Sequence, residues 1–443
     1  GMGGILADDM GLGKTVQVLS YLLAMKQNGQ TLPSLIVCPA SLVLNWAEEC
    51  QKFTPELSCV VVDGDAAHRA ELAESWPAAD LVVTSYDLLR RDEALYEGQE
   101  FYACILDEAQ AIKNHTTQKY KAVCKVRSRV RFALTGTPVE NRLGELWSIF
   151  SFLMPGYLPP YKSFCSRFEK PIVQEEDQTA VRRLNQLTGP FILRRMKSDV
   201  LKELPPKTEN VYRIELEEEQ RKLYLAAVVD AREKLQAAKP EDKMAVFAVL
   251  MRLREICCDP RLIADNWEGG SAKLDACAEL VSSAVEGGHR ILLFSQFTSM
   301  LELLAKRLDA EGISHFTLQG STPKPVRAEL VRRFNGGEVS VFLISLRAGG
   351  TGLNLTAADI VIHYDPWWNV AAQNQATDRA YRIGQQNPVQ VYKLIAQDTI
   401  EEKIVELQQA KQSLADTVTG TADGAILSMR PDELLQLLEG SEP

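Results

Sequence analysis

The sequence lacks the cysteine and histidine patterns that hold structural zinc. Its nine cysteines are scattered, without a C-x-x-C motif and with one adjacent pair, Cys257 and Cys258. Its five histidines lie far apart and form no H-x₃₋₅-H motif. Zinc ligands usually come in closely spaced pairs of this kind, so we predict no zinc site. Scattered cysteines are typical of reduced intracellular proteins, and we expect a cytoplasmic location.

Long apolar runs are also missing. No run approaches the roughly 18 residues that a membrane-spanning helix needs. The chain begins GMGGILADDM, a short strand followed by a polar loop rather than a signal peptide. We therefore expect no membrane association. The 443 residues are 46% hydrophobic and 24% charged, which is typical of an ordered globular protein with about two to four domains.

Positive charge is scarce overall but concentrated locally. The formal net charge is −10, which argues weakly against nucleic-acid binding. The segment 109–131 nevertheless contains basic residues and no acidic one: Lys113, Lys119, Lys121, Lys125, Arg127, Arg129 and Arg131. Such a stripe can contact phosphates, although a solvated helix and loop give the same pattern. Both interpretations stay open at this point.

Short β-branched runs recur in two sets. They cover 3–7, 34–40, 57–64, 79–86, 101–109 and 130–136, and later 290–297, 313–320, 339–346, 359–366 and 389–396. They lack strict alternation, which is typical of parallel strands that helices cover on both faces. The sequence therefore predicts an α/β fold of two parallel-sheet lobes with helical insertions between the lobe cores.

The breakers and helical patterns predict four segments. Lobe 1 covers 1–217 and carries a helical protrusion at about 140–205. A helical insertion of lobe 2 follows at 218–265, then lobe 2 itself at 266–410 and a C-terminal helical tail at 411–443. The stretch TENVYRIELE (208–217) is expected to return a last strand to the first sheet.

The stretch ADDMGLGKT has the form of a phosphate-binding loop and lies between a strand and a helix, as such loops do. Gly11 and Gly13 let the backbone curl so that its N–H groups face phosphate oxygens. Lys14 would reach the β- and γ-phosphates, and Thr15 would ligate Mg²⁺. Asp8 replaces the usual first glycine, and we expect it to be tolerated because that residue opens the turn without touching phosphate.

An acidic pair ends the apolar strand of ACILDEAQ. We predict that Asp107 holds Mg²⁺ through water and that Glu108 orients and activates the attacking water. Gln110 carries no titratable proton, so it is given a hydrogen-bonding, coupling role. A D-E dipeptide is common by itself. As the exit from a buried strand about ninety residues after a phosphate loop, it is a strong signal.

A third group of residues lies in QATDRAYRIGQ (375–385). On a helix, Arg379 and Arg382 share a face, and Gln375 lies one turn before Arg379. Ordinary surface charge would give the same pattern. The alternative is that these arginines of the second lobe stabilise transition-state charge on ATP bound to the first. Hydrolysis would then depend on lobe closure.

With these three elements in order, the chain resembles the Snf2 family of helicase-like ATPases over essentially its whole length. The matching segments are LADDMGLGKT (6–15), 36–49, 82–92, DEAQAIKN (107–114), 133–143, 291–297, 345–359 and QATDRAYRIGQ (375–385), together with insertion segments at 190–207 and 250–263. The resemblance implies two RecA-like lobes, ATP and Mg²⁺ as cofactors, and movement along double-stranded DNA with remodelling of DNA-bound proteins.

The resemblance also implies site residues. Those that bind the nucleotide are Asp9, Met10, Gly11, Leu12, Gly13, Lys14, Thr15, Gly352 and Gln375. Those near the DNA backbone are Ser41, Asn45, Trp46, Thr84, Ser85, Tyr86, Gln296, Arg347, Gly349, Gly350 and Asn354, with Trp368 coupling the DNA groove to the ATP cleft. Small residues, amides and hydroxyls suit contacts with phosphates that do not read bases.

The chain departs from the family pattern in three places. DEAQ replaces the more familiar DEAH, a variant similar to bacterial and archaeal members. Val370 stands where the family usually has proline. The adenine-recognising segment that precedes the phosphate loop in the family has no counterpart here, so we expect the chain to be a fragment.

Three hypotheses about function remain. The first is an ATP-dependent translocase on double-stranded DNA. The second is a strand-separating helicase of the same superfamily. The third is a truncated DNA-binding module whose nucleotide pocket is incomplete.

Overall fold

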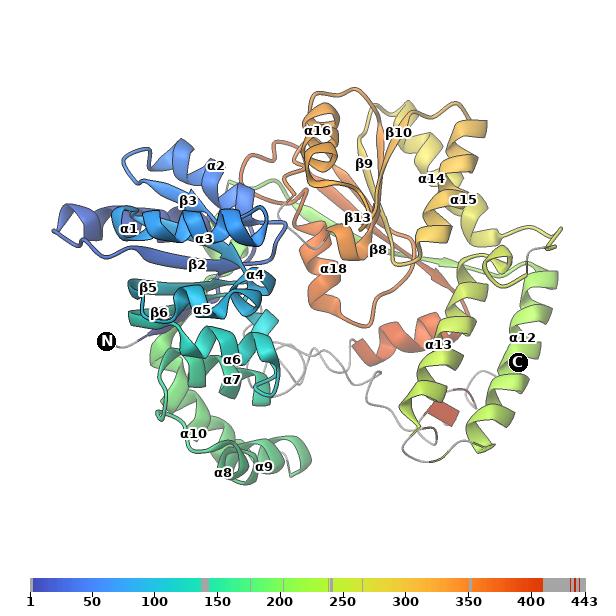
Figure 1. The fold of residues 1–443 in the computed structure, drawn as a ribbon. Coiled ribbons are helices and arrows are strands. Elements are labelled where there is room, and N and C mark those ends of the chain that lie inside the picture. The colour runs from blue at the N-terminus through green and yellow to red at the C-terminus, as the bar shows by residue number, and fades with distance from the viewer. Residues whose placement is uncertain are drawn as a thin grey trace. The chain divides into compact units, whose positions relative to one another are not determined.

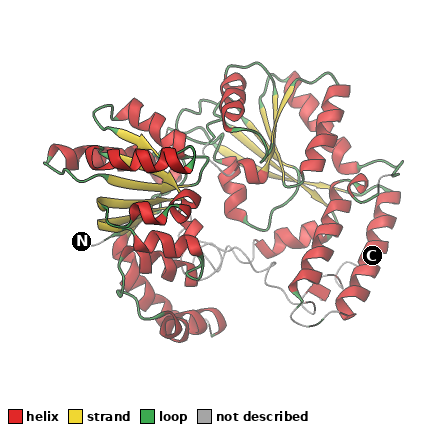
Figure 2. Ribbon diagram, viewed as in Figure 1, coloured by secondary structure: helices red, strands yellow, loops and turns green. Residues whose placement is uncertain are grey.

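The computed structural model describes residues 3–136, 143–175, 177–201, 203–237, 239, 242–264, 266–349, 353–408, 431, 434–435 and 438. The chain divides into two compact units, whose main parts are Gly1–Lys202 and Glu203–Leu414. Each unit contains one sheet flanked by helices (Figure 2). The predicted α/β fold with two parallel-sheet lobes is therefore confirmed.

The sheet of unit 1 is entirely parallel, with the order β3-β4-β2-β5-β6-β1-β7 in the described residues (Figure 1). Its strands are β1 (Gly4–Leu6), β2 (Ser34–Cys38), β3 (Cys59–Val61), β4 (Leu81–Ser85), β5 (Glu100–Asp107), β6 (Arg127–Leu134) and β7 (Ile192–Leu193). The first strand of the chain thus lies between two of the last strands of its unit.

Helices cover both faces of this sheet. They are α1 (Lys14–Gln27), α2 (Val43–Phe53), α3 (Ala66–Ser75), α4 (Tyr86–Arg91), α5 (Glu93–Tyr96), α6 (Gln118–Lys125), α7 (Leu143–Leu153), α8 (Tyr161–Phe164), α9 (Lys170–Gln174), α10 (Gln178–Thr188) and α11 (Lys197–Val200). In β2, Ile36 and Cys38 pack with α1 and α2, whereas Leu35 and Val37 face the core on the side of α4, α6 and α7. Burial on both faces explains why the strands lack alternation.

The sheet of unit 2 is also parallel, with the order β10-β11-β9-β12-β13-β8 among the described residues. Its strands are β8 (Lys207–Ile214), β9 (Ile291–Ser295), β10 (His315–Leu318), β11 (Val341–Ser345), β12 (Ile360–His363) and β13 (Val389–Ala396). The expected return of 208–217 to the first sheet is wrong. β8 pairs with β13 along its full length, and β7 already occupies the edge beside β1. The boundary expected at 217 therefore moves to 202.

The helices of unit 2 are α12 (Glu218–Ala237), α13 (Lys243–Cys258), α14 (Ala272–Glu286), α15 (Thr298–Ala310), α16 (Lys324–Asn335), α17 (Leu346–Gly349) and α18 (Val370–Thr377). Figure 1 shows α14 and α15 on one side of the strands and α16 and α18 on the other. A third core joins α12 and α13 to the helix at 400–408, with Leu434 and Leu438 buried against it. Apart from such single residues, the predicted tail at 411–443 lies outside the described part of the chain.

Neither a membrane-spanning helix nor a metal-binding cluster is found among the described residues. No helix there combines the length and the apolar character that crossing a membrane requires. No group of three or more His, Cys, Asp or Glu side chains there could hold a metal ion.

Candidate nucleotide-binding site

The phosphate-binding loop connects β1 to α1. Gly11 and Gly13 have φ angles of 88° and 74°, in the left-handed region that favours glycine. Gly13 is the N-cap of α1, and a Cβ added to it would meet nothing within 4 Å. The loop therefore leaves open space at the N-terminus of a fourteen-residue helix, where N–H groups lack intrahelical acceptors.

The Lys14 side chain bonds to the backbone of the phosphate-binding loop. Its Nζ donates to the carbonyl oxygens of Asp8 at 2.6 Å and Asp9 at 3.4 Å. Thr15 follows in the first turn of α1 and is partly exposed. The ammonium group and the hydroxyl group that were predicted to meet phosphate and Mg²⁺ thus lie at the same end of α1.

Asp8 is a buried anchor rather than a substitute for glycine. Its carboxylate is 0% exposed and accepts hydrogen bonds from Arg195 N and Nε, both at 3.0 Å, and from Gln17 Nε2 at 3.2 Å. Arg195 Nη2 also pairs with it. Burial opposes ionisation of Asp8, but the bonds from Arg195 and Gln17 outweigh it and lower the pKa of Asp8.

The backbone on either side of Asp8 is tied to the same distant segment. Ala7 N donates to Leu193 O at 2.7 Å, and Asp9 N donates to Arg195 O at 3.1 Å. The Asp9 carboxylate accepts from Lys197 N at 3.0 Å. The loop is therefore supported by the continuation of β7. Sequence reasoning assigned Arg195 no role, although it noted the segment 190–207.

The acidic pair ends β5. Asp107 Oδ2 accepts from Trp46 Nε1 at 2.9 Å, and Asp107 Oδ1 accepts from Glu108 N at 2.9 Å. Burial and the nearby Glu108 carboxylate raise the pKa of Asp107 to about 7. Two neighbouring, partly exposed carboxylates form an environment that a divalent cation would stabilise.

Glu108 connects this pair to the end of β6. Its φ of 50° is unusual for a residue other than glycine and is typical of functional sites. Gln110 Nε2 donates to Glu108 Oε2 at 2.7 Å, and Thr135 Oγ1 donates to Gln110 Oε1 at 3.1 Å. Gln110 thus has the hydrogen-bonding position given to it from the sequence, and Thr135 is a partner that sequence reasoning did not name.

Four predicted DNA contacts of unit 1 require correction. Trp46 is 1% exposed and holds Asp107, so it belongs to the nucleotide site. Thr84 is fully buried and accepts from Tyr96 Oη at 3.1 Å. Ser85 and Tyr86 are each 3% exposed; Ser85 caps α4, and Tyr86 Oη donates to Asp107 O at 2.9 Å. Side chains this buried do not present a surface to a duplex.

Ser41 and Asn45, the other two predicted DNA contacts of unit 1, are partly exposed. Asn45 Nδ2 donates to Glu49 Oε1 at 3.2 Å, one turn further along α2. Their exposure is compatible with the predicted contact.

The basic stretch 109–131 is largely neutralised by acids from other elements. Lys119 pairs with Asp87, Lys125 with Glu93, and Arg129 with Glu100. Arg131 donates to three backbone carbonyls, among them Phe152 O at 2.8 Å. These contacts favour the interpretation of the stretch as a structural surface rather than a phosphate-binding stripe.

The predicted arginines of unit 2 do not lie on a helix. α18 carries Gln375 but ends at Thr377, and the chain continues in turns through Arg379 and Arg382. Arg379 N bonds to Ala376 O, three residues back instead of four. Arg379 is 3% exposed and Arg382 is partly exposed. The expectation of a shared helical face is therefore wrong.

The remaining predicted residues of unit 2 are spread over several elements. Gln296 follows β9 and is partly exposed, Asn354 is exposed, and Trp368 is 6% exposed in the loop before α18. Arg347 and Gly349 lie in α17. The predicted residues Gly350 and Gly352 lie outside the described residues.

The fold and this site together define a P-loop protein of two parallel α/β units. A family model described as the SNF2-related domain matches residues 1–262, and one described as the helicase conserved C-terminal domain matches residues 272–384. The first match covers more than half of the chain, so the protein belongs to the SNF2-related family, as the motifs indicated.

Similar proteins agree with this family. The chain is 41% identical to an uncharacterized ATP-dependent helicase of Mycoplasma pneumoniae, over 99% of this chain and 42% of the relative. It is 40% identical to the putative ATP-dependent helicase/translocase YwqA of Bacillus subtilis, over 99% of this chain and 48% of the relative. The chain thus spans less than half the length of these relatives.

A solved structure of the Sulfolobus solfataricus SWI2/SNF2 ATPase core in complex with dsDNA is also similar. It is 36% identical over 98% of this chain and 92% of that chain, with a TM-score of 0.47.

Proposed function

We propose that this chain is the ATP-hydrolysing motor of a protein that moves along double-stranded DNA and remodels DNA-bound proteins. The observation that carries the proposal is the chain of contacts from Trp46 through Asp107 and Glu108 to Gln110 and Thr135. Together with the open loop at the N-terminus of α1, it supplies the parts that phosphoryl transfer to water requires.

The donor set suits Mg²⁺ and ATP. Mg²⁺ prefers hard oxygen ligands, and Thr15 and Asp107 supply a hydroxyl and a carboxylate. A bound Mg²⁺ ion would neutralise charge on the phosphates and on the neighbouring carboxylates of Asp107 and Glu108. Lys14 would exchange the carbonyls of Asp8 and Asp9 for phosphate oxygens.

Glu108 is the residue that would orient the attacking water and accept its proton. Gln110 fixes the carboxylate from one side, and Thr135 fixes Gln110. Arg379 and Arg382 would stabilise negative charge on the transferred phosphoryl group. This role rests on the motif resemblance.

The DNA part of the proposal rests on the family and on the printed descriptions of relatives, which name helicases and a helicase/translocase. Partly exposed polar residues support contacts to a phosphate backbone without base reading; they include Ser41 and Gln296 in the segments after β2 and β9, and Asn45 in α2. Movement along any sequence requires that kind of contact.

The test is ATP hydrolysis with and without duplex DNA. We expect duplex to stimulate hydrolysis more than single-stranded DNA does, and Glu108→Gln to reduce the rate by about 100-fold or more because it removes the base. A Glu108→Gln protein that still binds an ATP analogue serves as the control for folding. Triplex displacement then measures translocation.

Other outcomes would redirect the proposal. Robust unwinding of a tailed duplex would favour the strand-separating helicase. Duplex binding without ATP binding would favour the DNA-binding module.

A further inference from the structure

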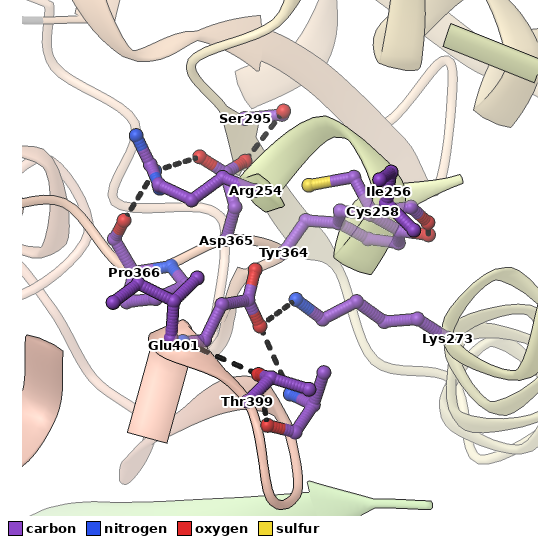
Figure 3. Close-up of polar contacts among 12 residues, drawn as sticks. Arg254, Ile256, Cys258, Lys273, Ser295, Tyr364, Asp365, Pro366, Thr399 and Glu401 are labelled. Carbon is purple, nitrogen blue, oxygen red and sulfur yellow. Dashed lines mark hydrogen bonds and ion pairs between the residues drawn. The ribbon is translucent and has the colours of Figure 1, made fainter. Parts of the chain in front are cut away.

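Unit 2 contains two fully buried ion pairs, which Figure 3 shows together. Arg254 Nη2 lies 3.2 Å from Asp365 Oδ2, and Lys273 Nζ lies 2.5 Å from Glu401 Oε2. All four side chains are at most 1% exposed. Removing two charges from water is costly, and buried pairs often contribute little net stability. Their presence therefore calls for an explanation other than stability.

Asp365 joins the ends of two strands. It follows β12 by two residues, and its Oδ1 accepts from Ser295 Oγ at 2.6 Å, at the end of β9. The same oxygen accepts from Gln296 N at 3.2 Å. Asp365 therefore fixes the backbone of Gln296, a residue placed near DNA by the sequence.

Arg254 connects the helical insertion to Asp365 and to the residues that follow it. It comes from α13, and its Nη2 donates to Pro366 O at 2.5 Å as well as to Asp365. Its guanidinium lies 4.2 Å from the Trp368 ring centroid and 5.6 Å from that of Phe297.

Aromatic rings help to hold the Arg254 guanidinium in place. Nε and Nη1 of Arg254 find no hydrogen-bond acceptor among the described residues, so the guanidinium is held partly by the ring faces. One side chain thus contacts the segments on both sides of it, Phe297 after β9 and Pro366 to Trp368 before α18.

We propose that the Arg254–Asp365 pair positions Gln296 and Trp368, and that it thereby makes the response of ATP hydrolysis to duplex DNA depend on the helical insertion α12–α13. Both are positioning residues, since they act through Gln296 and Trp368. The inference rests on the proposed function for its DNA response but not for the positioning itself.

The Lys273–Glu401 pair is a matched control within the same unit. Lys273 lies in the first turn of α14, and Glu401 Oε2 also accepts from Ala396 N at 2.9 Å, at the end of β13. This pair has the same burial and net charge, but its hydrogen bonds fix the end of β13 rather than that of β9.

The experiment compares two neutral double variants of the whole chain, Arg254→Met with Asp365→Asn, and Lys273→Met with Glu401→Gln. Each removes a complete pair, so neither leaves an uncompensated buried charge. The first readout is hydrogen exchange of the peptides that contain 295–298 and 364–369. The second is the ratio of duplex-stimulated to DNA-free ATP hydrolysis, measured well below both melting temperatures.

We expect the Arg254/Asp365 variant to exchange at least tenfold faster in both peptides and to raise the duplex concentration for half-maximal stimulation at least fivefold. The Lys273/Glu401 variant should stay within twofold of the unchanged chain in exchange of the 295–298 peptide and in the response to duplex; the 364–369 peptide is not compared for this variant, because Lys273 Nζ lies 5.4 Å from the Tyr364 ring centroid. Unchanged exchange in the first variant, or equal changes in the two variants, would overturn the inference.

The two proposals fail in different ways. Faster exchange in a chain whose hydrolysis never responds to duplex would refute the proposed function and leave the positioning role intact. Faster exchange with an unaltered response to duplex would refute the coupling to hydrolysis.

Discussion

A buried histidine connects a central strand of unit 2 to the helix that carries Gln375. His363, at the end of β12, is 1% exposed, and its Nε2 lies 2.9 Å from Thr377 Oγ1 at the end of α18. Its ring stacks on Phe294 with centroids 5.6 Å apart. Burial, and to a smaller degree the charge of Lys393, lower the pKa of His363 to about 3. The folded chain therefore keeps this histidine neutral.

The stability of unit 2 should fall as the pH falls below 6.5. The unfolded histidine binds a proton near pH 6.5 and the folded one near pH 3, so between these values the unfolded state binds more protons. The contribution is fully present above pH 6.5 and decreases by about 2 kcal/mol at pH 5. Urea unfolding at pH 7.5 and pH 5 measures it. His363→Gln is the control, and an equal pH dependence in that variant would contradict the assignment.

Asp8 and Trp46 show how far residue-level reasoning reached. The loop pattern led to the expectation that Asp8, at the position of the usual first glycine, opens the turn without touching phosphate, and its carboxylate is bonded instead to Arg195 and Gln17. Its partner could not be inferred, because Arg195 lies 187 residues away and no local pattern links the two. The motif assigned Trp46 to a DNA contact, but its indole N–H donates a hydrogen bond to Asp107. Which way a side chain on an amphipathic helix points depends on the packed core.

At the scale of elements, side-chain caps mark where two helices of unit 1, α4 and α6, begin. Ser85 Oγ accepts from Leu88 N at 3.2 Å and starts α4, and Thr117 Oγ1 accepts from Tyr120 N at 3.3 Å and starts α6. The residue types fit, since Ser and Thr are strongly preferred as N-caps. The Ser85 hydroxyl oxygen thus accepts its hydrogen bond from within unit 1.

Replacing Ser85 with alanine should lower the free energy of unfolding by about 1 kcal/mol, because an N–H of α4 loses its acceptor. Duplex affinity should stay within twofold. Thermal unfolding and a fluorescence anisotropy titration with labelled duplex measure the two effects, with Thr117→Ala as the matched cap control. A tenfold weaker duplex affinity at unchanged stability would restore the DNA contact that the motif suggested.

The pattern predicted which strands and helices form better than it predicted which elements they pair with. The run at 208–217 was correctly predicted to contain a strand, but the open edge that accepts it is set by β7, a two-residue strand with a weak pattern. The motif at 375–385 was expected to be one helix. Its backbone hydrogen bonds lose their regular four-residue spacing after Asp378, a change that the apolar periodicity does not encode.

At the scale of the whole molecule, each unit has its own sheet and its own buried cores. The tryptophans divide equally, with Trp46, Trp76 and Trp147 in unit 1 and Trp267, Trp367 and Trp368 in unit 2. Two parallel-sheet lobes were predictable from the two sets of apolar runs. The boundary was placed at 217 instead of 202, since a strand pattern does not specify its sheet.

We expect thermal unfolding to proceed in two transitions, one for each unit. An ATP analogue with Mg²⁺ should raise the transition of unit 1, by an amount equivalent to about 2.7 kcal/mol at a hundredfold excess over its dissociation constant. Calorimetry measures both transitions, and Lys14→Ala should abolish the shift. A single transition that moves as a whole would show that the two units unfold cooperatively.

The position of β1 has a consequence for synthesis on the ribosome. β1 and the phosphate loop are translated before the rest of unit 1, yet their neighbours β6, β7 and Arg195 come from the end of that unit. At about 5–20 residues per second, the nascent chain waits on the order of ten seconds or more before that partner emerges. The nucleotide site is thus begun with the first strand of unit 1 and completed only when the last strand of that unit has been made.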